Sequence, residues 1–196
     1  MISPCIPIEK HPLSPFLPDN AKILMLGSFP PKQDRWSMNF FYPNFQNDMW
    51  RIMGLVFYDN KHHFELNGEK RFDQAKIEQF CRVKGIALYD AACEVQRLQD
   101  NASDKFLQVV KVTDVESLLD KLPQCRAIVT TGQKATDVLV AQYGCPEPKV
   151  CEAVKITIAG REIEFWRMPS SSRAYPLKLE RKADAYRVMF ESLFSI

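Results

Sequence analysis

The sequence predicts a three-layer αβα domain, in which helices cover both faces of a central four-stranded, mainly parallel sheet. Two observations lead to this α/β fold class. Short apolar runs alternate along the chain with longer segments whose apolar residues recur at helical spacing. The 196 residues, 46% hydrophobic and 26% charged, contain no internal repeat, low-complexity tract or linker. One domain with a substantial core is therefore expected.

Residues 1–20 are predicted to form a proline-rich arm that packs on the single domain of residues 21–196. Five of the thirteen prolines lie in the first eighteen residues, and this density excludes a helix and favours extended chain. The N-terminus lacks the charged and apolar regions of a signal peptide, and no apolar run approaches the roughly 20 residues of a membrane span. We therefore expect a cytoplasmic protein.

Four apolar runs are the predicted strands of the sheet: residues 22–27, 86–89, 126–131 and 162–168. The first run is apolar without interruption up to Gly27, as expected of a strand that is buried on both faces. The last run forms a predicted hairpin with residues 155–158 around Ala159 and Gly160.

Helices are predicted between the strands from apolar periodicity and from capping residues. Residues 45–57 carry apolar side chains at positions i, i+3, i+4 and i+7. Asp73 is the predicted N-cap of a helix that ends at Gly85. Thr113 and Glu116 have the spacing of a capping box at the start of another helix.

Two further helices are predicted in the C-terminal third of the chain. Gly132 turns the third strand into a helix that reaches about Tyr143, and Pro176 suits the first turn of the last helix. The last helix has an apolar stripe that we expect to face the core, formed by Leu179, Ala183, Tyr186, Phe190 and Leu193.

The sequence contains none of the common metal or nucleophile patterns. The six cysteines form no C-x-x-C pair, and His62-His63 has no cysteine partner at zinc-finger spacing. No Ser–His–Asp arrangement, P-loop or G-x-G-x-x-G motif is evident, and neither these histidines nor His11 follows a predicted strand. We expect no metal and no organic cofactor.

The distribution of charge leaves two interpretations open. The net charge is +2, and residues 161–187 carry seven basic and four acidic side chains, so this region has a charge of +3 and the remainder −1. The region is either a surface that faces phosphates or a solvated helix of mixed charge.

Small, turn-forming or polar residues follow each predicted strand. They are Gly27–Pro31 after the first, Asp90 after the second, Thr131–Lys134 after the third and Pro169–Arg173 after the last. Ligands of parallel sheets bind outside the carboxyl ends of the strands, so we expect one crevice to gather these segments. Serine hydroxyls and backbone N–H groups there could bind phosphate oxygens, although each loop alone could be an ordinary turn.

Residues 39–50 combine aromatic and amide side chains directly after the first strand and its turn. An aromatic ring can stack on a base that has been flipped out of DNA, and an amide can read the base or hold a water. Two interpretations stay open for Tyr42 and Asn47. Tyr42 is either such a stacking ring or part of the core, and Asn47 either binds a ligand or caps the next helix.

Five segments in this order resemble motifs of the uracil-DNA glycosylase superfamily, closest to its hypoxanthine-DNA glycosylase and mismatch-specific uracil-DNA glycosylase branches. The resemblance covers nearly the whole chain from His11 onward. The segments are Leu26–Pro30, Phe41–Trp50, Gly85–Asp90, Gly132–Ala135 and Met168–Ser172.

The resemblance implies a uracil-DNA glycosylase-like fold and a monofunctional DNA glycosylase of base-excision DNA repair. Such a hydrolase breaks the N-glycosidic bond of a deaminated base, uracil or hypoxanthine, flipped out of DNA. The implied protein is a monomer whose partner is DNA containing a damaged or mismatched base.

The resemblance also implies roles for individual residues. Asn47 and Ser28 would be catalytic, with Asn47 holding the attacking water. The residues implied to contact the base are Phe29, Tyr42, Thr131 and Gly132. Those implied to contact DNA are Pro30, Pro169, Ser170, Ser171, Ser172 and Arg173.

Three positions depart from the family's pattern. Phe29 stands where the mismatch-specific branch has asparagine, Thr131 stands where the hypoxanthine branch tends to have asparagine, and Met168 stands at the place of a histidine in other branches. These departures favour an alternative, a non-catalytic DNA-binding protein with a glycosylase fold. The retained Tyr42 and Asn47 favour the enzyme.

Overall fold

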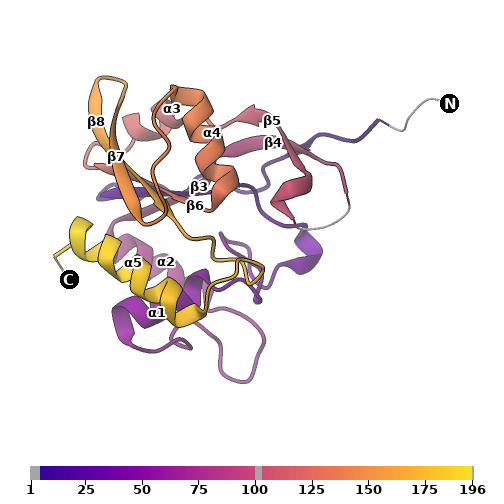
Figure 1. The fold of residues 1–196 in the computed structure, drawn as a ribbon. Helices are drawn as coiled ribbons and strands as arrows, with labels where there is room; N and C mark the ends of the chain where they lie inside the picture. The colour runs from indigo at the N-terminus through magenta and orange to yellow at the C-terminus, as the bar shows by residue number, and fades with distance from the viewer. Residues whose placement is uncertain (1–4, 100–102, 196) are drawn as a thin grey trace.

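The computed structural model describes residues 5–99 and 103–195, and its centre is a five-stranded sheet of order β3-β2-β6-β8-β7 (Figure 1). The strands are β2 (Ile23–Gly27), β3 (Ile86–Asp90), β6 (Ala127–Thr131), β7 (Glu152–Ile158) and β8 (Arg161–Met168). Neighbouring strands among β3, β2, β6 and β8 are parallel, as predicted. The count differs from the predicted four, because the hairpin adds β7 as an antiparallel fifth strand at the edge.

Helices cover both faces of this sheet, which confirms the predicted three layers. Figure 1 shows α3 (Val115–Asp120) and α4 (Gln133–Tyr143) on one face, with α1 (Met49–Tyr58), α2 (Gln74–Lys84) and α5 (Leu179–Leu193) on the other. Alternate residues of β2 explain this arrangement. Ile23 and Met25 pack with α1, α2 and α5, whereas Leu24 and Leu26 pack with α3 and α4. Because both faces of β2 are buried, its sequence is apolar without alternation.

A second, three-stranded sheet of order β1-β4-β5 lies beside the first and was not predicted. It consists of β1 (Glu9–Lys10), β4 (Ala92–Arg97) and β5 (Leu107–Val112), and both pairings are antiparallel. Its small apolar core contains Phe29. Short 3-10 helices at Gln33–Arg35 and Asp104–Phe106 precede α1 and β5 respectively. Sequence patterning missed β4 and β5 because each is short and has polar residues that interrupt its apolar ones.

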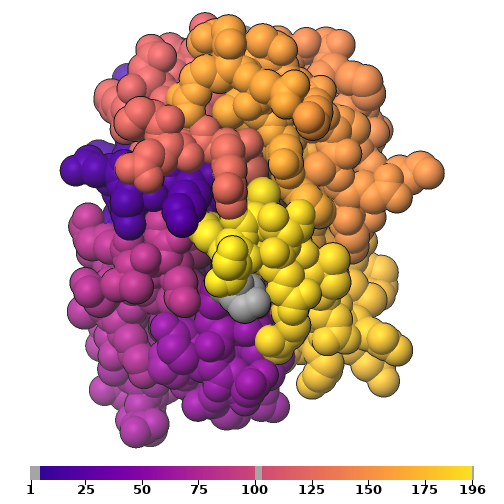
Figure 2. Space-filling view, turned by 90° about the vertical axis from the view of Figure 1, so that its left-hand side faces the viewer, coloured from indigo at the N-terminus to yellow at the C-terminus, as the bar shows by residue number. Residues whose placement is uncertain are grey.

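The N-terminal arm runs along the edge of the main sheet. Phe16 exchanges two backbone hydrogen bonds with Leu88 of β3, at 3.0 and 2.9 Å. The Asn20 side chain donates to the carbonyl of Arg82 in α2. Figure 2 shows the indigo arm lying against the magenta segment that contains these partners. The arm therefore covers an edge that would otherwise expose unpaired backbone groups.

Some helix ends lie where the sequence predicted them, and others do not. Asp73 caps α2, since its Oδ1 accepts a bond from N of Lys76 at 3.1 Å, and Gly85 ends α2 with a left-handed φ of 75°. The prediction that Pro176 lies in the first turn of α5 is wrong, because α5 begins at Leu179. None of the helices in residues 5–99 and 103–195 is long and apolar enough to cross a membrane.

The predicted capping box of α3 is also wrong. Asp114 is the N-cap, and its carboxylate accepts bonds from N and Oγ of Ser117 at 3.1 and 2.7 Å. The Thr113 hydroxyl instead donates to the carbonyl of Asp90 at 2.5 Å. Thr113 therefore ties the start of α3 to the end of β3.

We predict that Asp114→Ala lowers the free energy of unfolding, the usual effect of a lost N-cap. Glu116→Ala, the matched control, should change it by less than about 0.5 kcal/mol. Urea denaturation at neutral pH measures both. The hydrogen bonds from Ser117 lower the pKa of Asp114. Its contribution is therefore complete above the unfolded value of about 4 and disappears as the pH falls through the folded value. A larger loss from Glu116→Ala would contradict the assignment.

Candidate functional site

The carboxyl ends of the four parallel strands lie along one edge of the sheet, as the sequence predicts. β2 ends at Gly27 and β3 at Asp90, and these residues are register partners. A β-carbon at Gly27 would lie only 2.5 Å from Oδ1 of Asp90, so the carboxylate occupies the space that glycine leaves. β6 ends at Thr131 and β8 at Met168, whose carbonyl accepts a bond from N of Gly132 at 3.1 Å.

The N-terminal arm supplies a histidine to this edge. Nε2 of His11 lies 2.7 Å from Oδ2 of Asp90, and the two side chains are only 2% and 10% exposed. The backbone N of His11 donates to the carbonyl of Cys93 in β4 at 2.8 Å, which fixes the arm in place. The expectation that no histidine lies at a strand end is therefore wrong, because the arm brings His11 to a residue 79 positions away.

The second ring nitrogen of His11 determines its tautomer. The backbone N–H of Leu13 donates to Nδ1 at 3.1 Å, so Nδ1 carries a lone pair and the proton is on Nε2. We therefore assign His11 as a neutral imidazole whose Nε2–H donates to Asp90. This donor holds one carboxylate oxygen without neutralising the charge.

Tyr42 lies between Asp90 and the end of β6. Its hydroxyl makes a 2.9 Å hydrogen bond with Oγ1 of the buried Thr131, and its ring meets Trp50 edge to face at 6.1 Å. Burial, and secondarily the negative charge of Asp90, raise the pKa of Tyr42 far above its usual range, so the phenol stays protonated. Tyr42 also has a φ of 51°, which is uncommon for a residue with a side chain.

In the turn after β2, Ser28 makes a polar contact, whereas Phe29 packs into an apolar core. Oγ of Ser28 is partly exposed and donates to Oδ1 of Asp104 at 2.7 Å. Phe29 packs into the core of the small sheet and lies edge-on to His11. The Pro30 carbonyl accepts a bond from Arg97 at 2.6 Å. Phe29 therefore supports the arm and the small sheet, and this packing gives no support to its implied contact with a base.

Asn47 lies one residue before Asp48, the N-cap of α1, so it is not the capping residue that one interpretation of the sequence expects. Its Oδ1 accepts a hydrogen bond from N of Met49 at 3.0 Å. An amide oxygen has two lone pairs, so the second lone pair and the amide nitrogen remain for a ligand. The next residue, Asp48, is buried and accepts bonds from Arg173 at 3.2 Å and Arg51 at 3.5 Å.

The serine loop, Pro169–Ser172, follows β8 and is held on both sides. Oγ of Ser170 accepts a bond from N of Ser172 at 3.2 Å, and the carbonyl of the buried Ser171 accepts one from N of Asp48 at 3.0 Å. From α5, Tyr186 donates to the Pro169 carbonyl at 2.8 Å and Lys182 donates to the Ser172 carbonyl at 2.7 Å. The loop is thus anchored by both α1 and α5.

Gly132 lies directly against this loop. A β-carbon there would be 3.3 Å from Cβ of Ser170, and φ is 98°, so the position favours glycine for both space and conformation. The structure therefore brings together most of the predicted site residues. Phe29 and Pro30 lie to one side, among the residues that support the small sheet.

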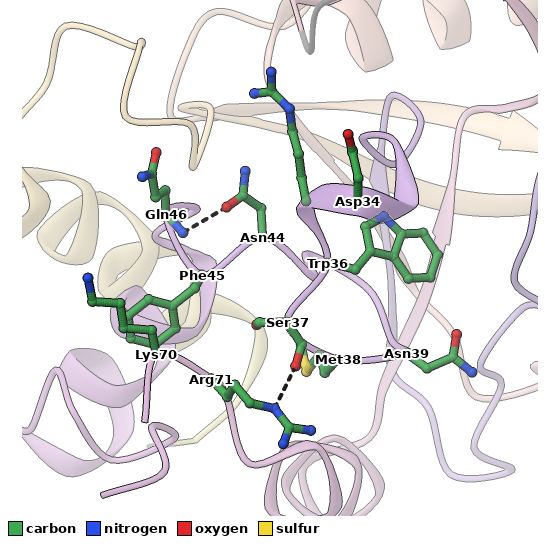
Figure 3. Close-up of a pocket in the computed structure, with 11 residues that line it drawn as sticks. Asp34, Trp36, Ser37, Met38, Asn39, Asn44, Phe45, Gln46, Lys70 and Arg71 are labelled. Atoms are coloured by element: carbon green, nitrogen blue, oxygen red, sulfur yellow. Dashed lines mark hydrogen bonds between the residues drawn. The ribbon is translucent and has the colours of Figure 1, made fainter. Parts of the chain in front are cut away.

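A surface groove of about 640 Å³ lies between the segment that joins β2 to α1 and the segment that joins α1 to α2 (Figure 3). Part of the aromatic and amide segment of residues 39–50 lines this groove. Arg71 donates to the Ser37 carbonyl across the groove, as Figure 3 shows. The lining residues are Asp34, Arg35, Trp36, Ser37, Met38, Asn39, Asn44, Phe45, Gln46, Lys70 and Arg71. The groove therefore presents aromatic, amide and cationic side chains.

Within the described ranges, no three His, Cys, Asp or Glu side chains come together in a group that could hold a metal ion. The carboxylates near the strand ends have other partners. Asp90 is bound by His11, Asp48 by two arginines and Asp104 by Ser28.

No protein-family model and no curated protein matches this chain. A solved structure does, the solution NMR structure of a "putative Uracil DNA glycosylase" from Methanosarcina acetivorans. The TM-score is 0.64 at 21% sequence identity, and the match covers 95% of this chain and 98% of that one. The chain therefore has the three-layer α/β fold of that protein over nearly its full length, which confirms the predicted fold class.

Sequence reasoning missed His11 as a member of the site and gave Asp90 no role. A signal existed for Asp90, since a carboxylate directly after a buried strand is unusual. No local signal exists for His11, because its partner lies in another part of the sequence.

We predict that Gly27→Ala destabilises the fold by about 1–3 kcal/mol, because the added methyl group displaces the Asp90 carboxylate. The effect should be clearly smaller in an Asp90→Ala background, where the clashing oxygen is absent. A double-mutant cycle from urea denaturation measures this coupling. Equal losses in the two backgrounds would contradict the close contact.

Proposed function

We propose that this protein is a DNA glycosylase that hydrolyses the bond between a damaged base and its deoxyribose. The observation that carries the proposal is the buried polar cluster of Asp90, His11, Tyr42 and Thr131 at the carboxyl ends of parallel strands. Ligands of such sheets bind there. The fold shared with the Methanosarcina acetivorans protein supports the proposal.

The proposed substrate is a deaminated base, uracil or hypoxanthine, that has been rotated out of DNA. Tyr42 stacks on the base with its ring, while its hydroxyl stays bonded to Thr131. Thr131 and Gly132 contact the base edge. N–H groups around Ser170 and Ser171 stabilise the negative charge of the departing base.

In the proposed reaction, a water molecule attacks the sugar carbon that carries the base. Asn47 uses its free lone pair and amide nitrogen to orient the attacking water, and Ser28 lies on the same edge. Lys134 lies within α4, and no lysine directly ends one of the parallel strands. We therefore propose a monofunctional hydrolase without Schiff-base chemistry.

The proposed DNA contacts come from the serine loop with its neighbouring Arg173, and the buried Pro30 supports them only indirectly. Only one N–H of the Arg173 guanidinium is bonded to Asp48, and the side chain is 54% exposed, so further donors point to solvent. We propose that the protein acts as a cytoplasmic monomer in base-excision repair, without a metal or organic cofactor.

A second candidate function is DNA binding without catalysis. Two observations favour it. Met168 is buried and offers no hydrogen bond to a leaving base, and the Asn47 oxygen is already engaged with α1.

A panel of DNA duplexes, each with one deaminated base, distinguishes the two functions. Each duplex is incubated with the protein and then treated with alkali, which cleaves the strand at an abasic site. Cleavage at uracil or hypoxanthine is expected. Tight binding of these duplexes without any cleavage would support the second candidate.

We predict different effects for two substitutions of Tyr42. Tyr42→Phe keeps the ring and should retain excision, with a modest loss of stability from the missing bond to Thr131. Tyr42→Ala should weaken transition-state binding by about 1–3 kcal/mol, the range for base–aromatic stacking. Single-turnover rates and melting temperatures are measured on the same samples, with the distant, exposed Tyr58→Ala as control. A stable Tyr42→Ala protein with the wild-type rate would exclude stacking.

We predict that Arg173→Ala weakens DNA binding to a similar extent for all sequences. It should reduce the slope of log K against log salt by about 1, the effect of one lost phosphate contact. Arg126, at the amino end of β6 on the opposite edge, supplies the control substitution Arg126→Ala. A salt slope in Arg173→Ala equal to that of the wild type would refute the contact.

A further inference from the structure

We propose that Asp90 is the catalytic base of this site and that His11, carried by the N-terminal arm, positions it. The inference rests on the proposed base excision and identifies the group that activates the water.

The geometry of Asp90 fits this role. One oxygen, Oδ2, is fixed by His11 at 2.7 Å, and the other, Oδ1, lies over the bare α-carbon of Gly27. The Asp90 side chain keeps 10% exposure, and none of the residues that the structure describes is found to donate a hydrogen bond to Oδ1. Among the described residues, no lysine or arginine pairs with Asp90, unlike the arginine-bound Asp48. Its negative charge is therefore available to a reacting group.

His11 suits the role of a positioning residue because of its fixed tautomer. The Leu13 N–H occupies Nδ1, so His11 donates from Nε2 and stays neutral. Aromatic rings hold the imidazole on several sides, with centroids at 5.2 Å, 6.1 Å and 4.5 Å for Phe29, Phe41 and Tyr89. Rotation of the ring would break the bonds to Asp90 and Leu13 together. The packing of the arm thereby completes the site.

Asn47 and Asp90 then have complementary roles. An amide can orient a water but cannot take its proton at neutral pH, whereas a carboxylate can do both. Asp48 is bound by two arginines, and Oδ1 of Asp104 already accepts a bond from Ser28. Asp90 is therefore the carboxylate best placed to act as a base.

The proposed step balances as follows. The C1′–N bond breaks, its electron pair leaves with the base, and the sugar develops oxocarbenium character. The water oxygen bonds to C1′, and one water proton passes to Oδ1 of Asp90. Asp90 later releases this proton to solvent, and the base anion takes one up. One water is consumed, and a neutral base and an abasic deoxyribose result. The negative charge of Asp90 also stabilises the cationic sugar.

The direct test is Asp90→Asn, which retains an acceptor for His11 but removes the charge and the basic oxygen. Single-turnover excision of the base that the wild type removes should fall about 10²–10⁴-fold, the usual contribution of a general base. DNA affinity and melting temperature should stay close to the wild type. Asp59→Asn, an exposed carboxylate at the end of α1, is the matched control and should keep its activity.

The positioning role of His11 is tested by the pH dependence of the single-turnover rate. His11→Ala removes the donor, which favours the protonated carboxylic acid, so the acid limb of the profile should move to higher pH. His11→Gln retains an N–H donor and should restore much of the wild-type profile. The titratable side chains that face Asp90 are His11, Tyr42, Tyr89 and Asp104. A purely structural role would lower the melting temperature and leave the limb unchanged.

The outcomes separate this inference from the proposed function. Wild-type excision by Asp90→Asn would overturn the role of Asp90 and leave the glycosylase function intact. No excision by the wild type on any duplex would overturn the function itself. If Asp90→Asn does not fold, the His11 variants decide, and an unchanged acid limb in His11→Ala would refute the inference.

Discussion

The buried carboxylate of Asp90 is the constraint on which the surrounding structure depends. A carboxylate in an apolar interior costs several kcal/mol unless hydrogen bonds satisfy it. Gly27 provides the space, and His11 provides a donor that is itself fixed by Leu13. That donor is available only because the arm pairs with the small sheet at Cys93. The arm, the small sheet and the end of β3 therefore form one interdependent unit.

The other half of the strand-end edge is held by a different network. Asp48 joins Arg51 and Arg173, and its backbone N–H binds the Ser171 carbonyl, so the start of α1 and the serine loop are tied together. Figure 2 shows the yellow α5 lying beside the violet α1 region, and α5 anchors the same loop through Lys182 and Tyr186. The loop is therefore rigid at its backbone while Arg173 extends toward solvent. Such anchoring fits the role proposed for the loop, which is to help hold a nucleotide rotated out of the DNA stack.

The fold was more predictable than the site, and particular elements show why. The main strands were found because β2, β3 and β6 are buried on both faces and are marked by continuous apolar runs. β4 and β5 are only partly buried and lack a continuous apolar run, so the sequence pattern did not identify them. Capping residues identified α2 correctly. At α3 the capping-box spacing selected Thr113, whereas the N-cap is Asp114 and the Thr113 hydroxyl is bonded to the end of β3.

By itself, the sequence determined the three layers, the parallel order of strand and helix, and the edge at which polar residues collect. It did so because burial on two faces, helical spacing and strand-end turns leave local signatures. The tertiary structure alone decided which polar residues meet. The pairing of His11 with Asp90 spans 79 residues and that of Tyr42 with Thr131 spans 89. Hydrogen bonds between distant segments depend on how the layers pack and how the arm is laid down, and no local pattern in the chain encodes that geometry.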